Sequence, residues 1–373
     1  MESLDEFDAQ LAASGSLAGV MVQSVDLTGR SAALRRADVA GTIFLGCALR
    51  AADASHLARS GALVFPRLPD LPFDPYRPGL YTPAELYRGL DRGYPATADA
   101  TILGWARRHL RPGELGADLA VALHDHAITE ALEQTVADSV PGRVVGIMGG
   151  HAQPRGTGPY RASARLAHQL ADAGLVVLSG GGPGAMEAAN LGAAFAGDPD
   201  ELDAAITELA AGDSWLTDVT AWARSAQALT RAHPCERLSL GIPTWFYGHE
   251  PPNLFATRIA KYFTNALRED ALLRLCGGGL VFLPGAAGTV QEVFQAVTPN
   301  FYAAEADAVV PLVMVGAEFW TETVPAWPLL HALAAGRSMA DRIHLVDSVD
   351  EALVLCRPAL SAPGPGAAPS APG

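Results

Sequence analysis

The stretch VFLPGAAGTVQE, residues 281–292, is the most informative part of this sequence. Its apolar start predicts a buried strand, and the small residues 285–288 predict a tight turn. The apolar positions from Val293 onward have helical spacing, so a helix is expected to begin near Thr289. Free backbone N–H groups at such a start, with the positive end of the helix dipole, form a site for a phosphate. Glu292, one turn into the helix, would then point at whatever the phosphate carries.

Thr289 and Glu292 also have the spacing of a capping box. In a capping box each of the two side chains accepts a hydrogen bond from a backbone N–H of the other residue. Glu292 would then only stabilise the helix end, and this motif alone leaves the structural and the catalytic interpretation open.

A second turn of the same kind follows the apolar run LVVL, residues 175–178. It begins the stretch SGGGPGAMEAAN, residues 179–190, in which Pro183 suits the first helical position and the glycines permit a sharp strand-to-helix turn. Two such turns favour a nucleotide-binding α/β sheet, whose ligands lie beyond the carboxyl ends of the strands. The sequence lacks both the Gly-Lys-Ser/Thr phosphate loop of the common NTPases and the glycine spacing of a standard NAD site.

Composition narrows the class of protein further. Apolar residues make up 49 % of the 373 residues and charged residues 18 %, so a sizeable core is expected. The net charge of −14 disfavours nonspecific binding to nucleic acid or to an anionic membrane. No apolar stretch approaches the ~20 residues that span a bilayer, and the acidic start MESLDE lacks a signal peptide. The four cysteines show no spacing typical of a zinc site or a disulfide framework, so we expect a soluble cytoplasmic protein.

Three regions are expected along the chain. Residues 141–358 alternate strand-like and helical patterns, which predicts a mostly parallel sheet with helices on both faces. The expected strands lie near residues 143–148, 175–179, 238–242, 279–283, 309–315 and 343–346. The expected helices lie near residues 160–173, 184–195, 202–211, 218–231, 253–275, 289–297, 325–335 and 348–356. Residues 1–140 form a smaller accessory domain, and the Pro/Gly/Ala-rich residues 359–373 are expected to be disordered.

A five-residue period runs through residues 32–54 of the accessory domain. Its apolar centres are Leu34, Val39, Phe44 and Leu49. The spacing is similar to that of pentapeptide-repeat solenoids, but it covers little more than one coil. We therefore expect an ordinary strand-and-turn segment rather than a solenoid.

A group of basic residues precedes the first turn. If residues 253–275 form one helix, then Arg258, Lys261 and Arg268 share a face of it. In so acidic a protein, three cations directly before a phosphate-type turn indicate an anion site. A solvated face of an amphipathic helix is the alternative.

Together these stretches resemble the LOG family of Rossmann-like nucleoside 5′-monophosphate phosphoribohydrolases, which includes cytokinin-activating enzymes and larger bacterial nucleotide nucleosidases. The family signature is Pro-Gly-Gly-x-Gly-Thr-x-x-Glu, preceded by an Arg about fifteen residues upstream. Thr289 and Glu292 match this signature, and Arg268 lies sixteen residues before its proline. The second motif glycine is Ala286, which crowds the turn. The resemblance covers about residues 142–356.

The resemblance implies hydrolysis of the N-glycosidic bond of a nucleoside monophosphate to free base and ribose 5-phosphate, without a metal or other cofactor. The transition state of such a reaction carries positive charge on the sugar. Glu292 would stabilise that charge and orient or deprotonate the attacking water, while Arg268 would bind the phosphate or stabilise the departing base. Glu187 is a second candidate carboxylate. The predicted substrate- and phosphate-binding residues are Gly181, Gly182, Gly184, Glu187, Gly285, Gly288 and Thr289.

Other polar residues precede the basic stretch. His249 and Glu250 lie at the expected ligand edge of the sheet, where His249 and the nearby Arg258 are candidates for substrate contacts. A polar turn with a helix cap is the alternative for His249 and Glu250, and His151 has the same two interpretations.

Two functions compete with a hydrolase. A nucleotide sensor or carrier on the same fold would bind without turnover, although a pure binder has no need of the Glu292 carboxylate. A single-stranded-DNA-binding protein is disfavoured by the net charge of −14. The expected partners are therefore a nucleoside monophosphate and, by the resemblance, a second copy of the chain in a homodimer or higher homo-oligomer, with no nucleic acid and no membrane.

Overall fold

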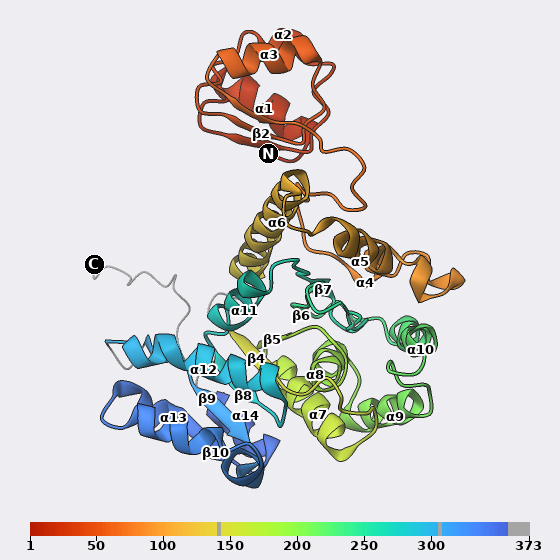
Figure 1. Ribbon diagram of the computed structural model, residues 1–373, viewed down its shortest axis with the longest axis vertical. Helices are drawn as coiled ribbons and strands as arrows, with labels where there is room; N and C mark the ends of the chain where they lie inside the picture. The colour runs from red at the N-terminus through yellow and green to blue at the C-terminus, as the bar shows by residue number, and fades with distance from the viewer. Residues whose placement is uncertain (140–142, 249, 305–307, 357–373) are drawn as a thin grey trace, which may run out of the picture. The chain divides into compact units, whose positions relative to one another are not determined.

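A computed structural model describes residues 1–139, 143–248, 250–304 and 308–356 of the chain (Figure 1). The chain divides into two compact units. The first consists of residues 1–80 and 104–131, and the second of residues 81–103 and the described residues from 132 onward. The predicted tail, residues 359–373, lies outside the described residues.

Three short parallel strands form the sheet of the first unit, in the order β1-β2-β3. They are β1 (Met21–Gln23), β2 (Ile43–Leu45) and β3 (Leu63–Phe65). Helices α1 (Leu4–Ser14), α2 (Ser31–Leu34) and α3 (Ala51–Arg59) alternate with them. Helix α1 has a clear start and stop, because Ser3 accepts a hydrogen bond from the N–H of Glu6 and Gly15 adopts a left-handed φ of 65°.

Successive turns of this unit stack on one another at a separation of 20 or 22 residues. The register pairs residue 16 with 38, 21 with 43 and 26 with 48, so residue i lies beside residue i+22. The next step pairs residue 43 with 63, a separation of 20. Such parallel stacking of coils is the arrangement of a solenoid. Residues 32–54 themselves contain the short strand β2 between turns, as expected, but the parallel stack that this strand joins was not expected.

The five-residue period marks the inward-facing side chains of one such coil. Leu34, Val39 and Phe44 lie in the buried core of the first unit, and Leu49 packs against that core. One coil offers too few repeats for the sequence pattern to reveal the stack. The separation of about 20 residues becomes visible only when two coils are compared.

Seven strands form the sheet of the second unit, in the order β10-β9-β8-β4-β5-β6-β7 (Figure 1). All of their pairings are parallel. The strands are β4 (Val144–Met148), β5 (Val176–Ser179), β6 (Ser239–Gly241), β7 (Arg258–Ile259), β8 (Gly279–Phe282), β9 (Leu312–Val315) and β10 (Ile343–Val346). Each of the predicted strands is present, and β7 is an additional one.

Helices alternate with these strands. They are α4 (Pro83–Leu86), α7 (Gly158–Asp172), α8 (Ala185–Ala194), α9 (Pro199–Ala210), α10 (Val219–Ala232), α11 (Asn265–Arg274), α12 (Ala287–Tyr302), α13 (Ala326–Ala334) and α14 (Val349–Cys356). Shorter turns are η1 (Leu90–Arg92), η2 (Tyr94–Ala96), the π-helical η4 (Phe319–Thr323) and η5 (Ser338–Arg342). Helices α5 (Ala98–His109) and α6 (Leu115–Ser139) contribute residues to both units. No helix of the described residues is long and apolar enough to cross a membrane.

Helices cover both faces of the larger sheet. Val145 and Ile147 of β4 belong to a buried cluster that contains apolar side chains of α7, α8 and α14. On the opposite face, a Cβ added at Gly146 would lie 2.6 Å from Sγ of Cys276, just after α11. The predicted Rossmann-like α/β class is confirmed, because a parallel sheet with helices on both faces is its defining arrangement.

The predicted helix over residues 253–275 is wrong in its first half. Residues 253–257 are irregular, Arg258 and Ile259 form β7, and the helix begins only at Asn265. Nearly all residues from 251 to 263 are buried, so the apolar spacing does not mark one face of a helix. A segment buried on all sides gives no periodicity that separates a helix from an irregular chain.

The proposed face of three cations therefore does not exist. Arg258 lies on β7 with an exposed side chain, whereas Lys261 is buried and pairs with Asp99. Only Arg268 lies on α11. Their sequence spacing placed them together only on the assumption of one continuous helix.

Residues 81–103 pack with the second unit, although they precede the expected domain boundary at residue 140. The backbone of Tyr81 pairs with that of Ile259 beside β7, and the hydroxyl of Tyr87 donates to the carbonyl of Pro252. This segment therefore borders the edge of the large sheet.

Candidate active site

The candidate site lies where the strand order of the large sheet reverses. From β4 the chain adds β5, β6 and β7 on one side, then returns to add β8, β9 and β10 on the other. The loops that follow the neighbouring strands β4 and β8 therefore diverge, and open α/β sheets bind ligands at such a point. A cavity of about 380 Å³ lies between these loops and the glycine-rich loop after β5. Of the predicted site residues, it is lined by Gly182, Arg268, Gly288, Thr289 and Glu292.

Helix α12 presents free backbone donors to this cavity. It begins at Ala287, with Ala286 as N-cap, and among the described residues no side chain caps it. The first helical hydrogen bond runs from the N–H of Val290 to the carbonyl of Ala286, at 3.1 Å. The N–H groups of Ala287, Gly288 and Thr289 precede that bond. A Cβ at Gly288 would meet no atom within 4 Å, so the space beside this turn is open. The predicted strand, turn and helix start are all present.

The capping-box alternative for Thr289 and Glu292 is wrong. The helix starts two residues before Thr289, so neither residue stands at a capping position. The Oε1 atom of Glu292 instead accepts a hydrogen bond from Nη1 of Arg268, at 3.4 Å. The side chain of Glu292 is 10 % exposed and borders the cavity. Its carboxylate therefore faces another helix and the cavity rather than its own backbone.

The guanidinium of Arg268 is held from several sides. Its Nε donates to the carbonyl of Ile242 at 2.8 Å, and its Nη2 donates to the carbonyl of Gly180 at 3.4 Å. Its Nη1 donates to Oε1 of Glu269 at 2.7 Å as well as to Glu292. Two buried carboxylates therefore share one guanidinium nitrogen. Each guanidinium nitrogen donates to an acceptor of the protein. Arg268 therefore fixes the positions of the two carboxylates.

Burial changes the proton affinity of Glu292. It raises the pKa of the Glu292 carboxyl from the ordinary value of 4.5 to about 7. Arg268 opposes this rise because its positive charge favours the ionised form, while the neighbouring carboxylates Glu269 and Glu250 add to it. A carboxyl group whose pKa lies near neutrality can both accept and release a proton at cellular pH.

The glycine-rich loop after β5 forms a second wall of the site. Gly181 and Gly184 both have a φ of 72°, which disfavours any other residue. A Cβ at Gly184 would lie 2.5 Å from the carbonyl oxygens of both Gly150 and His151. The loops after β4 and β5 can therefore approach each other only because position 184 lacks a side chain. Gly182 lines the cavity directly.

Gly285 shapes the turn after β8 without lining the cavity. A Cβ at this position would lie 2.2 Å from Oγ1 of Thr289, in the first turn of α12. Gly285 therefore lets Thr289, which is 5 % exposed, fold back against the turn. Ala286, which departs from the family signature, lines the cavity.

Glu187, the second candidate carboxylate, lies outside the cavity. Its side chain is 1 % exposed and forms a salt bridge with Arg155. The same guanidinium donates to Oγ of Ser225 at 2.8 Å and to the carbonyl of Trp222 at 3.3 Å. The structure thus gives Glu187 a role in joining α8 to α10. The sequence did not reveal this because Arg155 precedes Glu187 by 32 residues.

Of the polar residues predicted near the ligand edge of the sheet, the structure places some at the cavity. His249 lies outside the described residues. Glu250 and His151 both line the cavity, and Nδ1 of His151 lies 3.2 Å from Oε1 of Glu250. The ring of His151 also meets the ring of Trp215 edge to face, with centroids 5.9 Å apart. The loops after β4 and β6 thus meet at the mouth of the site.

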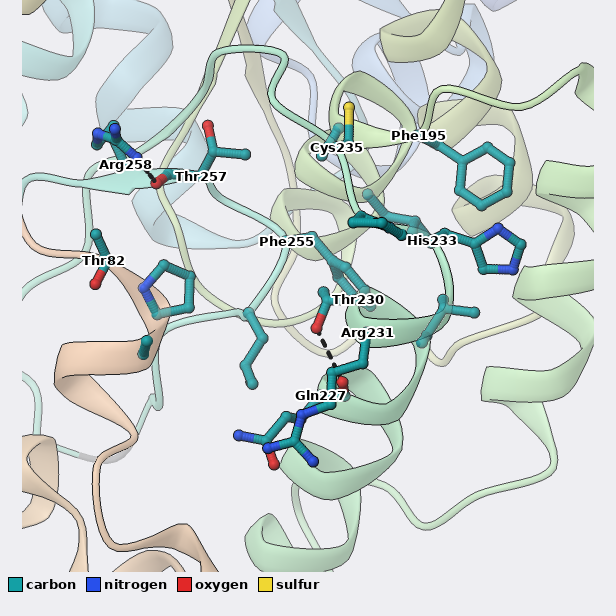
Figure 2. A pocket seen from close by; sticks show the side chains of 17 residues that line it. Thr82, Phe195, Gln227, Thr230, Arg231, His233, Cys235, Phe255, Thr257 and Arg258 are labelled. Atoms are coloured by element: carbon teal, nitrogen blue, oxygen red, sulfur yellow. Dashed lines mark hydrogen bonds between the residues drawn. The ribbon is translucent and has the colours of Figure 1, made fainter.

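Arg258 belongs to a different cavity, of about 450 Å³. Figure 2 shows this second cavity, in which Arg258 lies beside Thr257 and Arg231 lies beside Gln227. Its lining contains no Asp or Glu, so it offers no carboxylate to a cationic transition state. Arg258 lines this second cavity and does not line the smaller one, where Arg268 and Glu292 lie.

Glu269 is the site residue that the sequence analysis missed. It lines the cavity and lies closer to Arg268 than Glu292 does. The signal available in the sequence was its position next to Arg268. Adjacent residues on a helix point in different directions, so a direct contact between them was not expected.

Comparisons with known proteins add little to this geometry. No family model matches the sequence, and no curated protein matches it. Among solved structures, the molybdenum cofactor carrier protein from Chlamydomonas reinhardtii is 18 % identical and has a TM-score of 0.36; the alignment covers 59 % of this chain and 98 % of that one. The molybdenum cofactor binding protein from Rippkaea orientalis is 16 % identical with a TM-score of 0.35, over the same shares of the two chains. Likenesses this weak say nothing about ligand or activity, so the function must be argued from the site.

Proposed function

We propose that the protein hydrolyses the N-glycosidic bond of nucleoside 5′-monophosphates, releasing a free base and ribose 5-phosphate. The observation that carries the proposal is the position of Glu292. Its buried carboxylate borders a cavity beside the uncapped start of α12 and does not cap that helix. A nucleotide placed with its phosphate at the helix start would bring the sugar to this carboxylate.

The phosphate would bind to the backbone of α12. The N–H groups of Ala287, Gly288 and Thr289 point out of the helix start, where the helix dipole favours an anion. The side chains at 286–288 are no larger than methyl, so the phosphate can approach the backbone closely. Binding at this remote group would position the reacting bond.

Glu292 would act on the sugar and the water. As the bond between C1′ and the base nitrogen breaks, its electron pair leaves with the base and positive charge develops on the sugar. An ionised Glu292 stabilises that charge and accepts a proton from the water whose oxygen bonds to C1′. The departing base takes up a proton from water, and Glu292 releases the proton that it accepted, so one water is consumed and Glu292 is regenerated. The pKa of Glu292, about 7, suits a group that exchanges a proton near neutral pH.

Arg268 would act through the carboxylates. Its Nη1 holds Glu292 at 3.4 Å while its Nε is anchored on Ile242. This contact keeps part of the Glu292 population ionised, because a neighbouring cation lowers the pKa of a carboxyl group. In this proposal Arg268 is a positioning residue, rather than the phosphate ligand suggested by the sequence.

A substrate panel tests the proposed activity. Purified protein is incubated with nucleosides and with their mono-, di- and triphosphates, and released base is measured by chromatography. Monophosphates should be cleaved and unphosphorylated nucleosides barely. Equal turnover of adenosine and AMP would contradict phosphate binding at α12. Binding of nucleotides without any release of base would instead support a non-catalytic nucleotide sensor.

The variant Glu292→Gln tests the catalytic carboxylate. It keeps the side-chain volume but removes the negative charge, so base release should fall by at least ~10²-fold without a loss of melting temperature. The matched control is Glu201→Gln. Glu201 forms a true capping box with Asp198 at the start of α9, and its variant should retain full turnover. Normal turnover by Glu292→Gln would remove this residue from the mechanism.

The assembly belongs to the same proposal. The family resemblance implies a homodimer or a multiple of it, packed through helices of the second unit. Light scattering at micromolar concentration checks this, and a monomer would contradict it.

A further inference from the structure

One buried carboxylate oxygen of a residue that lines the cavity lacks a hydrogen-bond partner. Within the described part of the chain, Oε2 of Glu269 is buried and unpartnered, although Oε1 of the same carboxylate is held by Arg268 at 2.7 Å. The side chain of Glu269 is 4 % exposed and lines the cavity. Asn265, one turn earlier on α11, has a second buried acceptor without a partner, its Oδ1.

An acceptor in this position indicates a missing donor. Buried polar atoms are nearly always hydrogen-bonded, and an exception calls for an explanation. Glu269 is also electrostatically unfavourable at this position. It adds a second negative charge beside Glu292 and raises the pKa of the Glu292 carboxyl. A purely structural partner for Arg268 would need only Oε1. The unpartnered Oε2 therefore indicates a ligand that donates a hydrogen bond.

The chemistry of the ligand follows from the location of Glu269. A phosphate is an acceptor and an anion, so it is excluded from a site beside two carboxylates. Glu269 and Glu292 share Nη1 of Arg268, so a ligand that reached both carboxylates would contact them with neighbouring atoms. If Glu292 lies at C1′ of a nucleotide, the adjacent donor is the hydroxyl on the next carbon. Carboxylates bind this ribose 2′-hydroxyl in other nucleotide-binding folds.

We propose that Glu269 accepts a hydrogen bond from the ribose 2′-hydroxyl and makes the site selective for ribonucleotides over 2′-deoxyribonucleotides. This inference rests on the proposed function, because it takes the position of the sugar from the role of Glu292. It adds a specificity-determining residue whose effect can be measured without turnover.

The test compares the equilibrium binding of ribose 5-phosphate and 2-deoxyribose 5-phosphate by calorimetry. Neither ligand contains a base, so a donor on the base cannot contribute. Wild-type protein should bind ribose 5-phosphate roughly 10- to 100-fold more tightly, the range for a hydrogen bond to a charged group. Glu269→Met removes both acceptors at similar volume and should abolish the preference, while Glu269→Gln should reduce it.

Asp270→Asn is the matched control. Asp270 is the next residue on α11, with a side chain that is 65 % exposed and paired with Arg274, so its variant should keep the wild-type preference. Circular dichroism confirms that each variant is folded. Equal binding of the two sugar phosphates by wild type, or an unchanged preference in Glu269→Met, would overturn the role of Glu269 and leave the hydrolase proposal standing. Failure of wild type to bind either sugar phosphate would overturn both proposals.

Discussion

Lys261 and Asp99 form a salt bridge in which Nζ lies 2.7 Å from Oδ1, and each side chain is only 1 % exposed. Asp99 also accepts hydrogen bonds from Nε1 of Trp245 at 2.8 Å and from the hydroxyl of Tyr94 at 2.7 Å. Burial lowers the pKa of Lys261, and the charge of Asp99 opposes that shift. The pair joins residues 81–103 to the chain that follows β7.

Lys261→Met should therefore destabilise the second unit by about 3–5 kcal/mol, because it leaves Asp99 charged and buried without its cation. Urea denaturation measures this change in the free energy of unfolding. Arg274→Met is the control, since the salt bridge between Arg274 and Glu133 has side chains that are 48 % and 45 % exposed. That variant should lose no more than ~1 kcal/mol. Similar losses in the two variants would contradict a structural role for the buried pair.

The variant Glu187→Gln tests whether Glu187, like Glu292, is a candidate for catalysis or only a structural residue. The substitution weakens the buried salt bridge with Arg155, so we expect a loss of about 3 kcal/mol in stability. Glu187 does not line the cavity, so kcat per folded molecule should stay near the wild-type value when measured well below the melting temperature. A large fall in kcat with unchanged stability would instead place Glu187 in the mechanism.

The raised pKa of Glu292 makes stability depend on pH in a defined direction. The folded protein holds the Glu292 proton up to about pH 7, whereas the unfolded chain releases it near 4.5. The folded state thus binds more protons in this window, and the associated stability is lost as pH rises. Between pH 4.5 and 8, wild type should lose on the order of 3 kcal/mol relative to Glu292→Gln. If the free energies of unfolding of wild type and Glu292→Gln changed equally with pH, the raised pKa of Glu292 would be contradicted.

Turnover should have the opposite pH dependence. If ionised Glu292 stabilises the cationic transition state, kcat rises as pH increases through about 7, the pKa of that carboxyl. Rates measured from pH 5 to 9 check this expectation. A rate that falls over the same range would indicate that the protonated form is the active one.

Two glycines of the site should respond differently to substitution by alanine. Gly184→Ala places a methyl group 2.5 Å from two backbone carbonyls in a left-handed conformation, so stability should fall by at least ~2 kcal/mol. Gly288→Ala meets no atom within 4 Å and lies in the first turn of α12, so stability should hold or increase slightly. Its methyl group would still obstruct the proposed phosphate site. Thermal unfolding and AMP binding, measured on both variants, separate the two effects.

The sequence predicted the large sheet well because most of its strands are short apolar runs. Strands 143–148 and 279–283 were placed to within a residue or so, and with them the turn that carries Glu292. Strands and turns of this kind are determined by residues that are close together in the sequence. The helix predicted over residues 253–264 is wrong for the opposite reason. The conformation of this segment depends on contacts with distant residues such as Tyr81 and Asp99.

The candidate site was predicted in part. Arg268, Gly182, Gly288, Thr289 and Glu292 meet at one cavity as expected, because the ends of parallel strands converge. The partners of their side chains could not be read from the sequence. Whether a glutamate faces the ligand or an internal arginine depends on side-chain directions in three dimensions, and neither sequence spacing nor residue type determines these directions.

The stacked coils of the first unit make its length adjustable. Because residue i lies beside residue i+22 or i+20, each coil contacts only its immediate neighbours. An insertion of a whole coil would extend the stack without disturbing its register. An insertion of half a coil would place polar side chains where the buried row of apolar residues must continue. Evolution can therefore lengthen or shorten this unit only in discrete steps.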